Sequence, residues 1–350
     1  MSIIVKIYHK IRDQYLISLD LKRQRDKMRS GVNGYVLTKE QEQQARDYFA
    51  PYIKADLSAH NFYTEKTGKF YANYMPDDLH YSRVNTFFND RLEVRFLSNK
   101  CLFPQLFRGV KQPVEVASRS GGLWFDGQRQ LISRQVLDNL LAAEPEIVAK
   151  KASGSGGGKG VYFVAGKDFA TVERHFPEDI VIQRPMQQHP DLAAINASSV
   201  NTVRVLSLLT KEGVKVYSSI LRIGRNGSRV DNAGSGGVTC GITDDGKLKK
   251  YAYAMNGDRF EAHPDTGLPF EGTQVPGFDK CLEAVSKLHV QIPRFPLVSW
   301  DLAVDPDGDP VLIEANLRYG SIDIHQLNNG PLFGDDTQKI LKMVFGEEKK

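Results

Sequence analysis

Apolar residues recur about every four positions near the start of the chain, as at Ile3, Ile7 and Ile11. This spacing predicts one or two amphipathic helices over residues 3–29, with a basic outer face. Two interpretations of the segment stay open. It lies on an anionic membrane surface, or it docks on the body of the protein with its basic side in solvent.

The polar segment that follows predicts further helices. Residues 38–41 (Thr-Lys-Glu-Gln) have the capping-box pattern, so a helix is expected to begin there and to end before Pro51. Residues 52–100 are polar and aromatic, with a mostly helical pattern.

After about residue 104, short runs rich in β-branched residues alternate with helical patterns. Strands are expected at 114–117, 147–150, 161–165, 180–183, 203–210, 214–223, 236–242, 297–304 and 311–315. Helices are expected near 133–143, 168–175, 278–291 and 335–345. The mixture predicts an α+β fold in which antiparallel sheets predominate from Val203 onward.

Composition and charge narrow the class of protein. The chain has 350 residues, of which 41% are hydrophobic and 25% charged, enough for two or three subdomains around a large core. Residues 1–31 hold eight basic and three acidic residues, a net charge of +5, so the rest of the chain carries −1 of the total +4. A near-neutral body without a basic, aromatic face argues against nucleic acid as a partner.

The location expected from the sequence is cytoplasmic. No apolar run approaches the length of a membrane span, and the start of the chain lacks a signal-peptide pattern. The three cysteines are far apart and form no CxxC pair, which is typical of a reducing compartment. If the basic segment contacts a membrane, the expected place is its inner surface.

A glycine-rich loop between two strands is the first candidate for chemistry. Five glycines between positions 154 and 160 allow backbone N–H groups to approach a polyanion. Lys159 in the loop, and Lys150 or Lys151 at the end of the first strand, can add positive charge. The segment matches neither a Walker A loop nor the dinucleotide fingerprint. We interpret it as a hairpin lid over phosphates; a plain surface hairpin is the alternative.

A second candidate is the segment 299–316, which predicts two strands joined by a tight polar turn. Asp301 and Glu314 are expected to lie opposite one another on these strands. Asn316 faces the same side as Glu314, because alternate residues of a strand share a face. Two carboxylates and an amide oxygen predict a Mg²⁺ site. The alternative is a paired network with a structural role.

The order of lid, sheet and acidic hairpin resembles the ATP-grasp superfamily over about residues 95–330. It is similar above all to the sugar-transfer-associated ATP-grasp proteins. The further matches are Gln188-His189-Pro190, Asn201-Thr202-x-Arg204, Asp231-Asn232 with Gly236-Gly237, the run from His263 to Gly267, and Glu314-x-Asn316 with Gln326. The resemblance implies two α+β subdomains that sandwich ATP.

The domains expected on this basis are a basic amphipathic segment (1–31), a helical region (32–100), a subdomain with the lid (101–180), a subdomain with the metal site (181–335) and a C-terminal helix and tail (336–350).

The resemblance implies ATP and Mg²⁺ as cofactors and assigns candidate residues to them. Those assigned to ATP are Lys100, Lys150, Lys151, Ser155, Gly156, Gly157, Gly158, Lys159, Gln183, Arg184, Pro185 and Met186. The choice between Lys150 and Lys151 stays open. Those assigned to Mg²⁺ are Asp301, Glu314 and Asn316. Those expected to act in catalysis are Arg222, Arg204 and Lys151. Those expected to contact substrate are Asn201, Asp231, Asn232, His263, Arg318 and Gln326.

The activity that the resemblance implies is a ligase. ATP phosphorylates a substrate carboxylate, and an amine then attacks the acylphosphate, in polysaccharide or secondary-metabolite biosynthesis. Two alternatives are carried with it. One is a kinase of the same fold that leaves the phosphate on a small molecule or sugar. The other is a nucleotide-binding scaffold without turnover.

Overall fold

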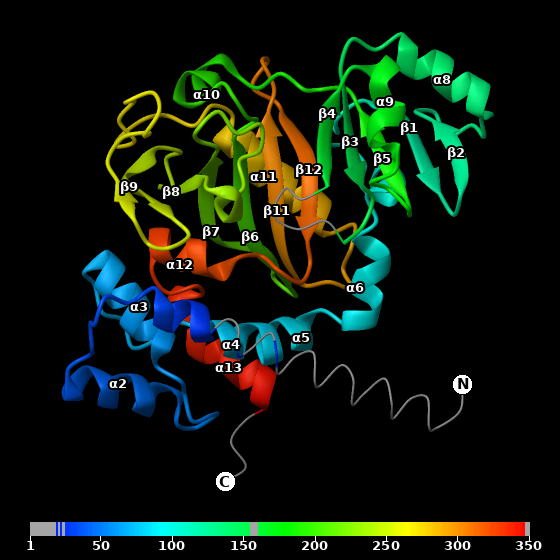
Figure 1. The fold of residues 1–350 in the computed structure, drawn as a ribbon. Coiled ribbons are helices and arrows are strands. Elements are labelled where there is room, and N and C mark those ends of the chain that lie inside the picture. The colour runs from blue at the N-terminus through cyan, green and yellow to red at the C-terminus, as the bar shows by residue number, and fades with distance from the viewer. Residues whose placement is uncertain (1–18, 20–21, 23–24, 155–159, 347–350) are drawn as a thin grey trace, which may run out of the picture.

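The computed structural model describes residues 19, 22, 25–154 and 160–346 of the chain. Two antiparallel sheets lie side by side, and a layer of helices lies beneath the larger sheet (Figure 1). The expected α+β fold is confirmed. Most of the predicted basic segment, and residues 155–159 of the glycine-rich loop, lie outside the described residues.

Short helices make up the region before the first sheet. The capping box expected at Thr38 is present, because Thr38 accepts from the Gln41 backbone N–H and the Gln41 side chain reaches back to Thr38. The helices are α2 (Lys39–Phe49), α3 (Ser58–Thr67), α4 (Asp77–Leu79), the π-helical η1 (His80–Val84), α5 (Asn85–Phe88), α6 (Arg91–Leu97), η2 (Lys100–Leu102) and α7 (Phe103–Leu106). The mostly helical character predicted for 52–100 is confirmed.

The smaller sheet has the strand order β2–β1–β5–β3–β4, and all its neighbouring strands are antiparallel. Its elements are β1 (Glu115–Ser120), β2 (Leu123–Asp126), α8 (Arg134–Ala142), β3 (Ile147–Lys151), β4 (Val161–Val164), η3 (Gly166–Asp168), α9 (Phe169–Glu173) and β5 (Ile180–Gln183). Helices α8 and α9 cover one face with apolar side chains. Since β5 lies in the middle of this sheet, the sheet continues past the boundary expected at residue 180.

The larger sheet has the order β10–β9–β8–β7–β6–β11–β12 and is also antiparallel throughout. The elements of this half are α10 (Pro190–Ile195), β6 (Thr202–Thr210), β7 (Gly213–Ile223), η4 (Ala233–Ser235), β8 (Val238–Ile242), β9 (Leu248–Ala254), β10 (Arg259–Phe260), α11 (Phe278–His289), β11 (Leu297–Val304), β12 (Pro310–Asn316), α12 (Ile322–Asn329), η5 (Gly334–Asp336) and α13 (Thr337–Phe345). The antiparallel sheet predicted from Val203 onward is confirmed.

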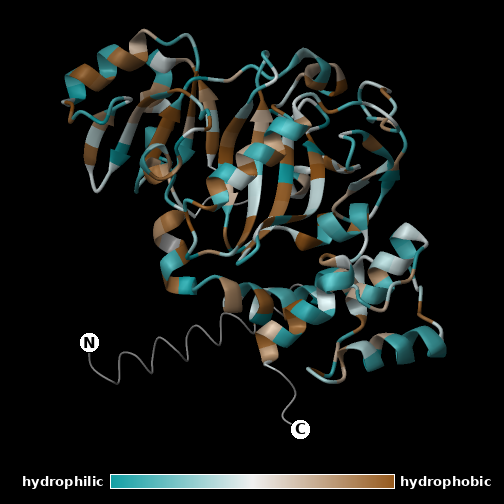
Figure 2. Ribbon diagram, turned by 180° about the vertical axis from the view of Figure 1, so that it is seen from behind, coloured by the Kyte–Doolittle hydropathy of each residue, from teal (hydrophilic) through white to brown (hydrophobic). Residues whose placement is uncertain are grey.

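The main core lies between this sheet and α11, where apolar side chains of both meet around the buried Trp300. Seen from behind, a helix lies across the strands of the larger sheet (Figure 2). A second cluster joins the N-terminal helices to the opposite side. It contains Phe49 of α2, Leu206 of β6 and Ile340 of α13. Burial of this apolar surface makes the helical region part of the same folded body.

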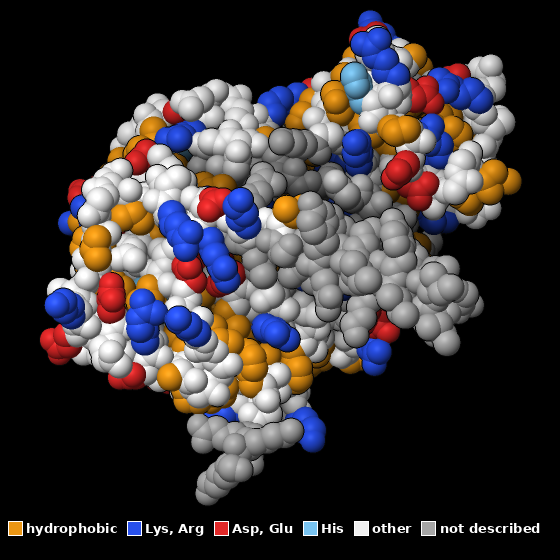
Figure 3. All heavy atoms as spheres, turned by 60° about the horizontal axis from the view of Figure 1, so that its bottom comes forward, with side chains coloured by type: hydrophobic (Ala, Val, Ile, Leu, Met, Phe, Trp, Pro, Cys, Tyr) orange, Lys and Arg blue, Asp and Glu red, His pale blue; other side chains and the backbone are white. Residues whose placement is uncertain are grey.

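The described surface mixes both signs of charge. On the face seen from below, Lys and Arg side chains stand among Asp and Glu side chains (Figure 3). Cys101, Cys240 and Cys281 are buried and unpaired. No helix in the described part of the chain combines the length and the apolar character needed to span a bilayer.

Candidate active site

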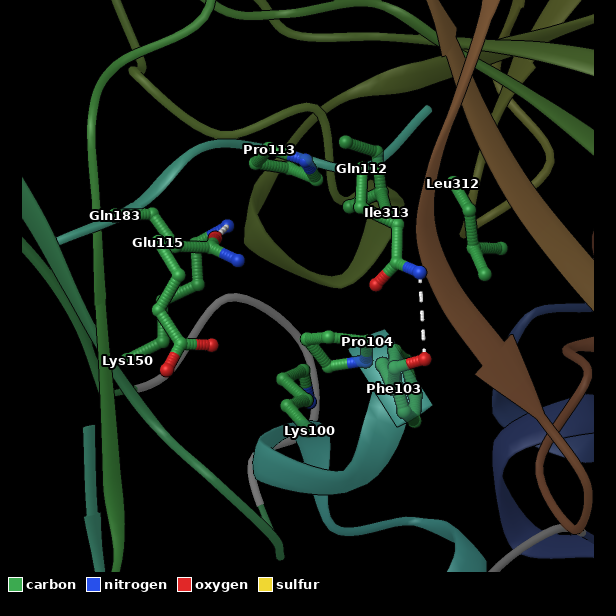
Figure 4. Close-up of a pocket in the computed structure, with 10 residues that line it drawn as sticks. All are labelled: Lys100, Phe103, Pro104, Gln112, Pro113, Glu115, Lys150, Gln183, Leu312 and Ile313. Carbon is green, nitrogen blue, oxygen red and sulfur yellow. Dashed lines mark hydrogen bonds between the residues drawn. The ribbon is translucent and has the colours of Figure 1, made fainter. Parts of the chain in front are cut away.

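A pocket lies where the two sheets meet, and its walls come from both (Figure 4). Helices η2 and α7, strands β1, β3 and β5, and strand β12 all contribute. The cavity enclosed between these elements has a volume of about 20 Å³. The residues that line it are Lys100, Phe103, Pro104, Gln112, Pro113, Glu115, Lys150, Gln183, Leu312 and Ile313.

Lys150 is the lysine of β3 that lines this pocket. Its Nζ donates a hydrogen bond to Gln183 Oε1 at 2.9 Å. Lys151 faces the other side of the strand, as the alternation of strand residues requires, and its aliphatic chain lies beside Gly160. Of the two lysines, Lys150 is therefore the one in the pocket, and which of them binds phosphate stays a prediction. The catalytic role expected of Lys151 stays a prediction.

The ammonium group of Lys150 is buried and lies near a second positive charge, that of Lys100. Burial lowers the pKa of its ammonium to about 8, and the nearby charge of Lys100 adds to this effect. A group with this pKa is still mostly protonated at pH 7. An incoming anion would therefore meet a poorly hydrated positive charge, which is attracted more strongly than an exposed one.

Lys100 connects the two halves of the site. Its backbone N–H donates to Ala152 O at 2.8 Å in the smaller sheet's half, and its Nζ donates to Glu314 Oε1 at 2.7 Å on β12. Asn99 fixes the start of η2 by accepting from the Cys101 backbone N–H at 3.0 Å. The two lysines therefore meet in one pocket, as the family resemblance implied.

A buried ion network lies beside the pocket on the larger sheet. Strand pairing sets Arg204 opposite Asp301 and Arg222 opposite Thr202. Arg204 binds Asp301 through Nε and Nη2, at 2.6 and 2.7 Å, and Arg222 Nη1 binds Asp301 Oδ2 at 2.6 Å. Arg222 also reaches Asp231 Oδ1 at 3.2 Å, and Asp231 accepts from the Thr202 hydroxyl.

The network controls the charge of both carboxylates. Burial alone would raise the pKa of the Asp301 carboxyl, but the two guanidiniums more than offset it and hold the pKa at about 2. For Asp231 burial prevails, so its pKa is raised although Arg222 opposes the shift. Both arginines are fixed in place by these bonds, so the site holds them ready to meet an anion.

The three expected metal ligands come together. Asp301 and Glu314 are direct partners across β11 and β12, and Asn316 Nδ2 lies 3.4 Å from Asp301 Oδ2. Two carboxylates and an amide are the donor set that Mg²⁺ prefers. Asp301 Oδ2 already accepts from Arg204 and Arg222, whereas Oδ1 accepts from Arg204 alone. Glu314 and Asn316 therefore fit a Mg²⁺ site best. Asp301 has the fewest lone pairs left for a metal ion, because both of its oxygens already accept hydrogen bonds from arginine.

The described residues offer no cluster of three His, Cys, Asp or Glu side chains arranged for a metal ion. Any Mg²⁺ site here thus depends on the amide oxygen of Asn316 as well as on carboxylates. Its assignment stays a prediction.

Three of the residues expected to contact substrate are buried and hold the fold together. Asn201 donates to Leu192 O at 2.8 Å and Asn196 O at 2.9 Å. His263 Nε2 shares a hydrogen bond with Gly224 O at 2.8 Å. The third is Gln326, whose amide accepts from the Met75 N–H at 2.8 Å and donates to Met75 O at 2.9 Å. This packing argues against direct substrate contact by the three.

The other three have different surroundings. Asp231 belongs to it, and the Asn232 side chain accepts from the Gly234 N–H at 2.7 Å and so begins η4. Arg318 follows the acidic hairpin formed by β11 and β12, and its guanidinium lies 4.8 Å from the centre of the Tyr319 ring. Their contact with a substrate stays a prediction.

Four of the residues that the resemblance assigns to ATP lie at the end of β5 and directly after it. Gln183 lines the pocket, and the Arg184 N–H donates to Val114 O at 2.9 Å. The Arg184 side chain forms a bidentate ion pair with Glu144 and is largely exposed. Pro185 and Met186 are half-buried, and their assignment to ATP is not tested by any contact. Ser155, Gly156, Gly157, Gly158 and Lys159 lie outside the described residues.

The sequence reasoning missed most of the pocket's apolar lining and one acid. Phe103, Leu312 and Ile313 carry no motif of their own, since apolar residues of this kind occur throughout the chain. Glu115 carried a signal, because it is a lone acid between Val114 and Val116 in a predicted strand.

Residues 169–342, about half of the chain, match the family model of sugar-transfer associated ATP-grasp proteins. No curated protein matches the sequence. The fold is similar to those of solved structures, one of which is an N5-carboxyaminoimidazole ribonucleotide synthetase bound to ADP (12% identity, 64% of this chain and 46% of that one, TM-score 0.38). A D-alanine–D-alanine ligase from Bacillus anthracis bound to ATP (15%, 71% and 64%, 0.40) and the ATP-grasp ligase PsnB bound to a minimal precursor (12%, 73% and 64%, 0.38) are others.

The chain spans about half to two thirds of the length of these solved structures. The chain belongs to the ATP-grasp superfamily, and its second half carries the match to the sugar-transfer associated family.

Proposed function

We propose that this protein is an ATP- and Mg²⁺-dependent ligase that activates a small-molecule carboxylate as an acylphosphate for attack by an amine. The observation that carries the proposal is the meeting of two lysines with the arginine–carboxylate network across one pocket. Phosphoryl transfer needs positioned charge more than a protein nucleophile, and positioned charge is what this pocket offers.

The balance of charge supports a requirement for a divalent cation. Three carboxylates lie against the site: Asp231, Asp301 and Glu314. Four cations oppose them: Lys100, Lys150, Arg204 and Arg222. The net charge is +1, far short of the charge of ATP at neutral pH. Mg²⁺, held by Glu314 and Asn316 with Asp301 beside them, would supply the missing positive charge to the phosphate oxygens.

The chain's own residues have distinct parts in this reaction. Lys100 and Lys150 bind the phosphates of ATP from the two sides of the pocket. Arg222, steadied by Asp301 and Asp231, orients the substrate carboxylate and then the phosphate on it. The carboxylate oxygen attacks the γ-phosphorus and ADP leaves. The amine then attacks the acyl carbon, an amide bond forms and phosphate departs.

The pathway follows only from the family description. We propose polysaccharide or secondary-metabolite biosynthesis as the setting, in the cytoplasm.

The first test is nucleotide binding by a matched pair of variants. Lys150 and Lys151 are neighbours on one strand, but only Lys150 lines the pocket. Lys150→Met should weaken Mg-ATP binding at least tenfold, and Lys151→Met should leave it within about threefold. Equal effects of the two changes, or no binding by the wild-type protein, would overturn the proposal.

The second test identifies the reaction. A ligase releases phosphate from ATP only when the carboxylate and the amine are both present, and hydroxylamine traps its acylphosphate as a hydroxamate. Transfer of the γ-phosphate to a stable product, without free phosphate, would establish the kinase alternative. Nucleotide binding without turnover across a panel of carboxylic acids and amines would favour the scaffold.

A further inference from the structure

Four positive side chains gather at one end of the larger sheet, which in Figure 1 is the end that carries the β9 label, away from the smaller sheet. They are Lys69, Lys249, Lys250 and Arg259. Neighbouring lysines are paired, Lys66 with Glu65 and Lys247 with Asp245. Within the described part of the chain, none of the four forms an ion pair with a carboxylate. Their charges are therefore available to an anion.

Lys249 is held in place as a half-buried cation. Its Nζ donates to Asn329 Oδ1 at 2.7 Å. Its side chain crosses Gly241, where a Cβ would lie 2.8 Å from Lys249 Cδ. Burial lowers the pKa of this ammonium, with Lys69 adding to the shift and the exposed Asp244 opposing it. A partly desolvated charge is costly unless a counter-charge meets it, so this lysine points to an anionic ligand.

Lys69 reaches the cluster from the helical layer. Helix α3 ends at Thr67, and Lys66 in its last turn packs on Gly257, in the turn between β9 and β10. Lys69 follows directly after this helix end and is exposed. Besides burial, its charge is a cause of the lowered pKa of Lys249, so the two ammonium groups lie close enough to repel one another. Like charges that gather in this way attract an anion.

Arg259 is oriented by an aromatic ring. Its guanidinium lies 4.2 Å from the centre of the Tyr251 ring, and Lys250 Nζ lies 5.4 Å from the same centre. The ring packs on a buried apolar cluster that includes Tyr253, the cross-strand partner of Arg259. Because alternate residues of β9 share a face, Lys249, Tyr251 and Arg259 lie on one face of the sheet. A guanidinium supported in this way is suited to bidentate binding of a phosphate.

The cluster is separate from the catalytic pocket, although it lies on the same face of the sheet as Arg222. Arg222, Thr239, Tyr253 and Arg259 are successive cross-strand partners on β7, β8, β9 and β10. Three strand spacings place the backbone of Arg259 about 14 Å from that of Arg222. Helix α12 packs against the strands between them. An anion held by the cluster thus leaves the pocket between the two sheets open.

The number and kind of cations favour a phosphate over a carboxylate. A phosphate monoester carries a charge of about −2 at neutral pH and three acceptor oxygens, whereas a single arginine can satisfy a carboxylate. The apolar cluster under Tyr251 also contains Met28, near the end of the basic segment 1–31 with its net charge of +5. A phosphate on a lipid would meet both sets of charges, and a phosphate on a soluble compound would meet the cluster alone.

We propose that Lys69, Lys249 and Arg259, with Lys250 beside them, form a second anion site that binds the phosphate group of a ligand other than the nucleotide. The site is independent of the proposed function, since it shares no residue with the catalytic pocket. Two sources supply such a phosphate, the headgroup of an anionic phospholipid and a soluble phosphate monoester.

The soluble source is tested by isothermal titration of the full chain with glycerol 3-phosphate in EDTA. Lys249→Met combined with Arg259→Gln should weaken binding about tenfold or more, because two charge-assisted contacts are lost. The matched control combines Lys167→Met with Arg174→Gln, which removes the same two kinds of charge from exposed positions beside α9. This control should stay within about twofold of the wild-type protein, because distant exposed charges are screened.

The lipid source is tested by sedimentation with phosphatidylcholine vesicles that contain phosphatidic acid. The wild-type protein and the control pair should sediment with these vesicles, and the Lys249→Met, Arg259→Gln pair should largely stay in solution. Binding of vesicles without binding of glycerol 3-phosphate assigns the site to a lipid, and the reverse assigns it to a soluble compound. Either result supports the site. Arg259→Gln alone carries the test if the double variant does not fold.

Three results would overturn the inference. One is a wild-type protein that binds neither probe. Another is binding that the double variant retains; loss of that binding in Lys150→Met would then place the phosphate in the catalytic pocket. The third is equal weakening in the control pair, which would reduce the effect to overall charge. The melting temperature of Lys249→Met should stay level or rise, because a partly buried charge is removed while an apolar stem still crosses Gly241; a marked fall would make Lys249 a structural residue.

Discussion

Replacing Asp301 by asparagine tests whether this carboxylate anchors the two arginines of the site. The side chain is 3% exposed, and Asp301 binds Arg204 at 2.6 and 2.7 Å and Arg222 at 2.6 Å. Its pKa of about 2, against an ordinary value of 3.8, corresponds to about 2 kcal/mol of stability at neutral pH. Removing the charge also leaves buried guanidiniums underpaired, so the full loss should be about 3–5 kcal/mol.

The measurement is thermal unfolding, followed by circular dichroism, with EDTA and without nucleotide. For a chain of 350 residues, an unfolding entropy of about 2.1 cal/mol/K per residue converts the expected loss into a melting temperature lower by about 4–7 °C. The matched control is Glu314→Gln, the facing carboxylate on β12. Glu314 is 29% exposed and binds one lysine, so its loss should cost about 0–1 kcal/mol.

A double variant sharpens the test. Adding Arg204→Met to Asp301→Asn should recover part of the loss, because the guanidinium that binds Asp301 through two nitrogens is removed together with its partner. The reasoning is refuted if Asp301→Asn destabilises no more than Glu314→Gln. A purely metal-binding Asp301 would behave in that way, since its removal would relieve the repulsion between two acidic neighbours.

Stability should also fall steeply below pH 6.5. Burial lowers the pKa of four histidines to about 3 or 4, and these are His60, His80, His289 and His325. Each loses stability as pH falls from 6.5 toward its folded pKa, whereas Asp77, with a pKa raised to about 8 by burial and by Asp323, gains over the same range. In this range the unfolded chain binds a net three more protons than the folded chain, so the free energy of unfolding falls by about 4 kcal/mol per pH unit. A melting temperature unchanged between pH 7 and 5.5 would contradict this prediction. Arg229 belongs to the half that contains the larger sheet and forms a bidentate ion pair with Glu146 of the other half. Its guanidinium also lies 3.8 Å from the centre of the Phe163 ring in the β3–β4 hairpin, so Arg229 connects the two halves. Arg229→Ala should weaken ATP binding several-fold in a fluorescence titration while stability changes by less than about 1 kcal/mol, because the pair is exposed; unaltered affinity would argue against a bridge. Gly166→Ala should lower the free energy of unfolding by about 1–3 kcal/mol, because its Cβ would lie 1.9 Å from a carbonyl oxygen of α8. Urea denaturation measures the change, and wild-type stability would show that the backbone here can move without cost.

The sequence by itself predicted most of the strands and helices and the facing carboxylates of the acidic hairpin, but it did not predict β2, β9, α10 or α12. Local spacing was sufficient for the features that it predicted. Strand periodicity placed Asp301, Glu314 and Asn316 on one face, and the structure has Asp301 and Glu314 as direct partners. The capping box at Thr38 needed only four residues of sequence. The lysines before and after the smaller sheet's first strands were found as separate motifs, but no local rule could bring them into one pocket.

The tertiary structure alone decided which polar groups lie together in the site and which form hydrogen bonds that stabilise the fold. Asn201, His263 and Gln326 match motif positions, yet their side chains form hydrogen bonds with backbone atoms of the fold. Lys150 rather than Lys151 lines the pocket because β3 pairs with β5 in one register. The position of Glu115 opposite Gln183 likewise follows from the pairing of β1 with β5. Such outcomes depend on contacts between residues far apart in the chain, and residue spacing carries no information about them.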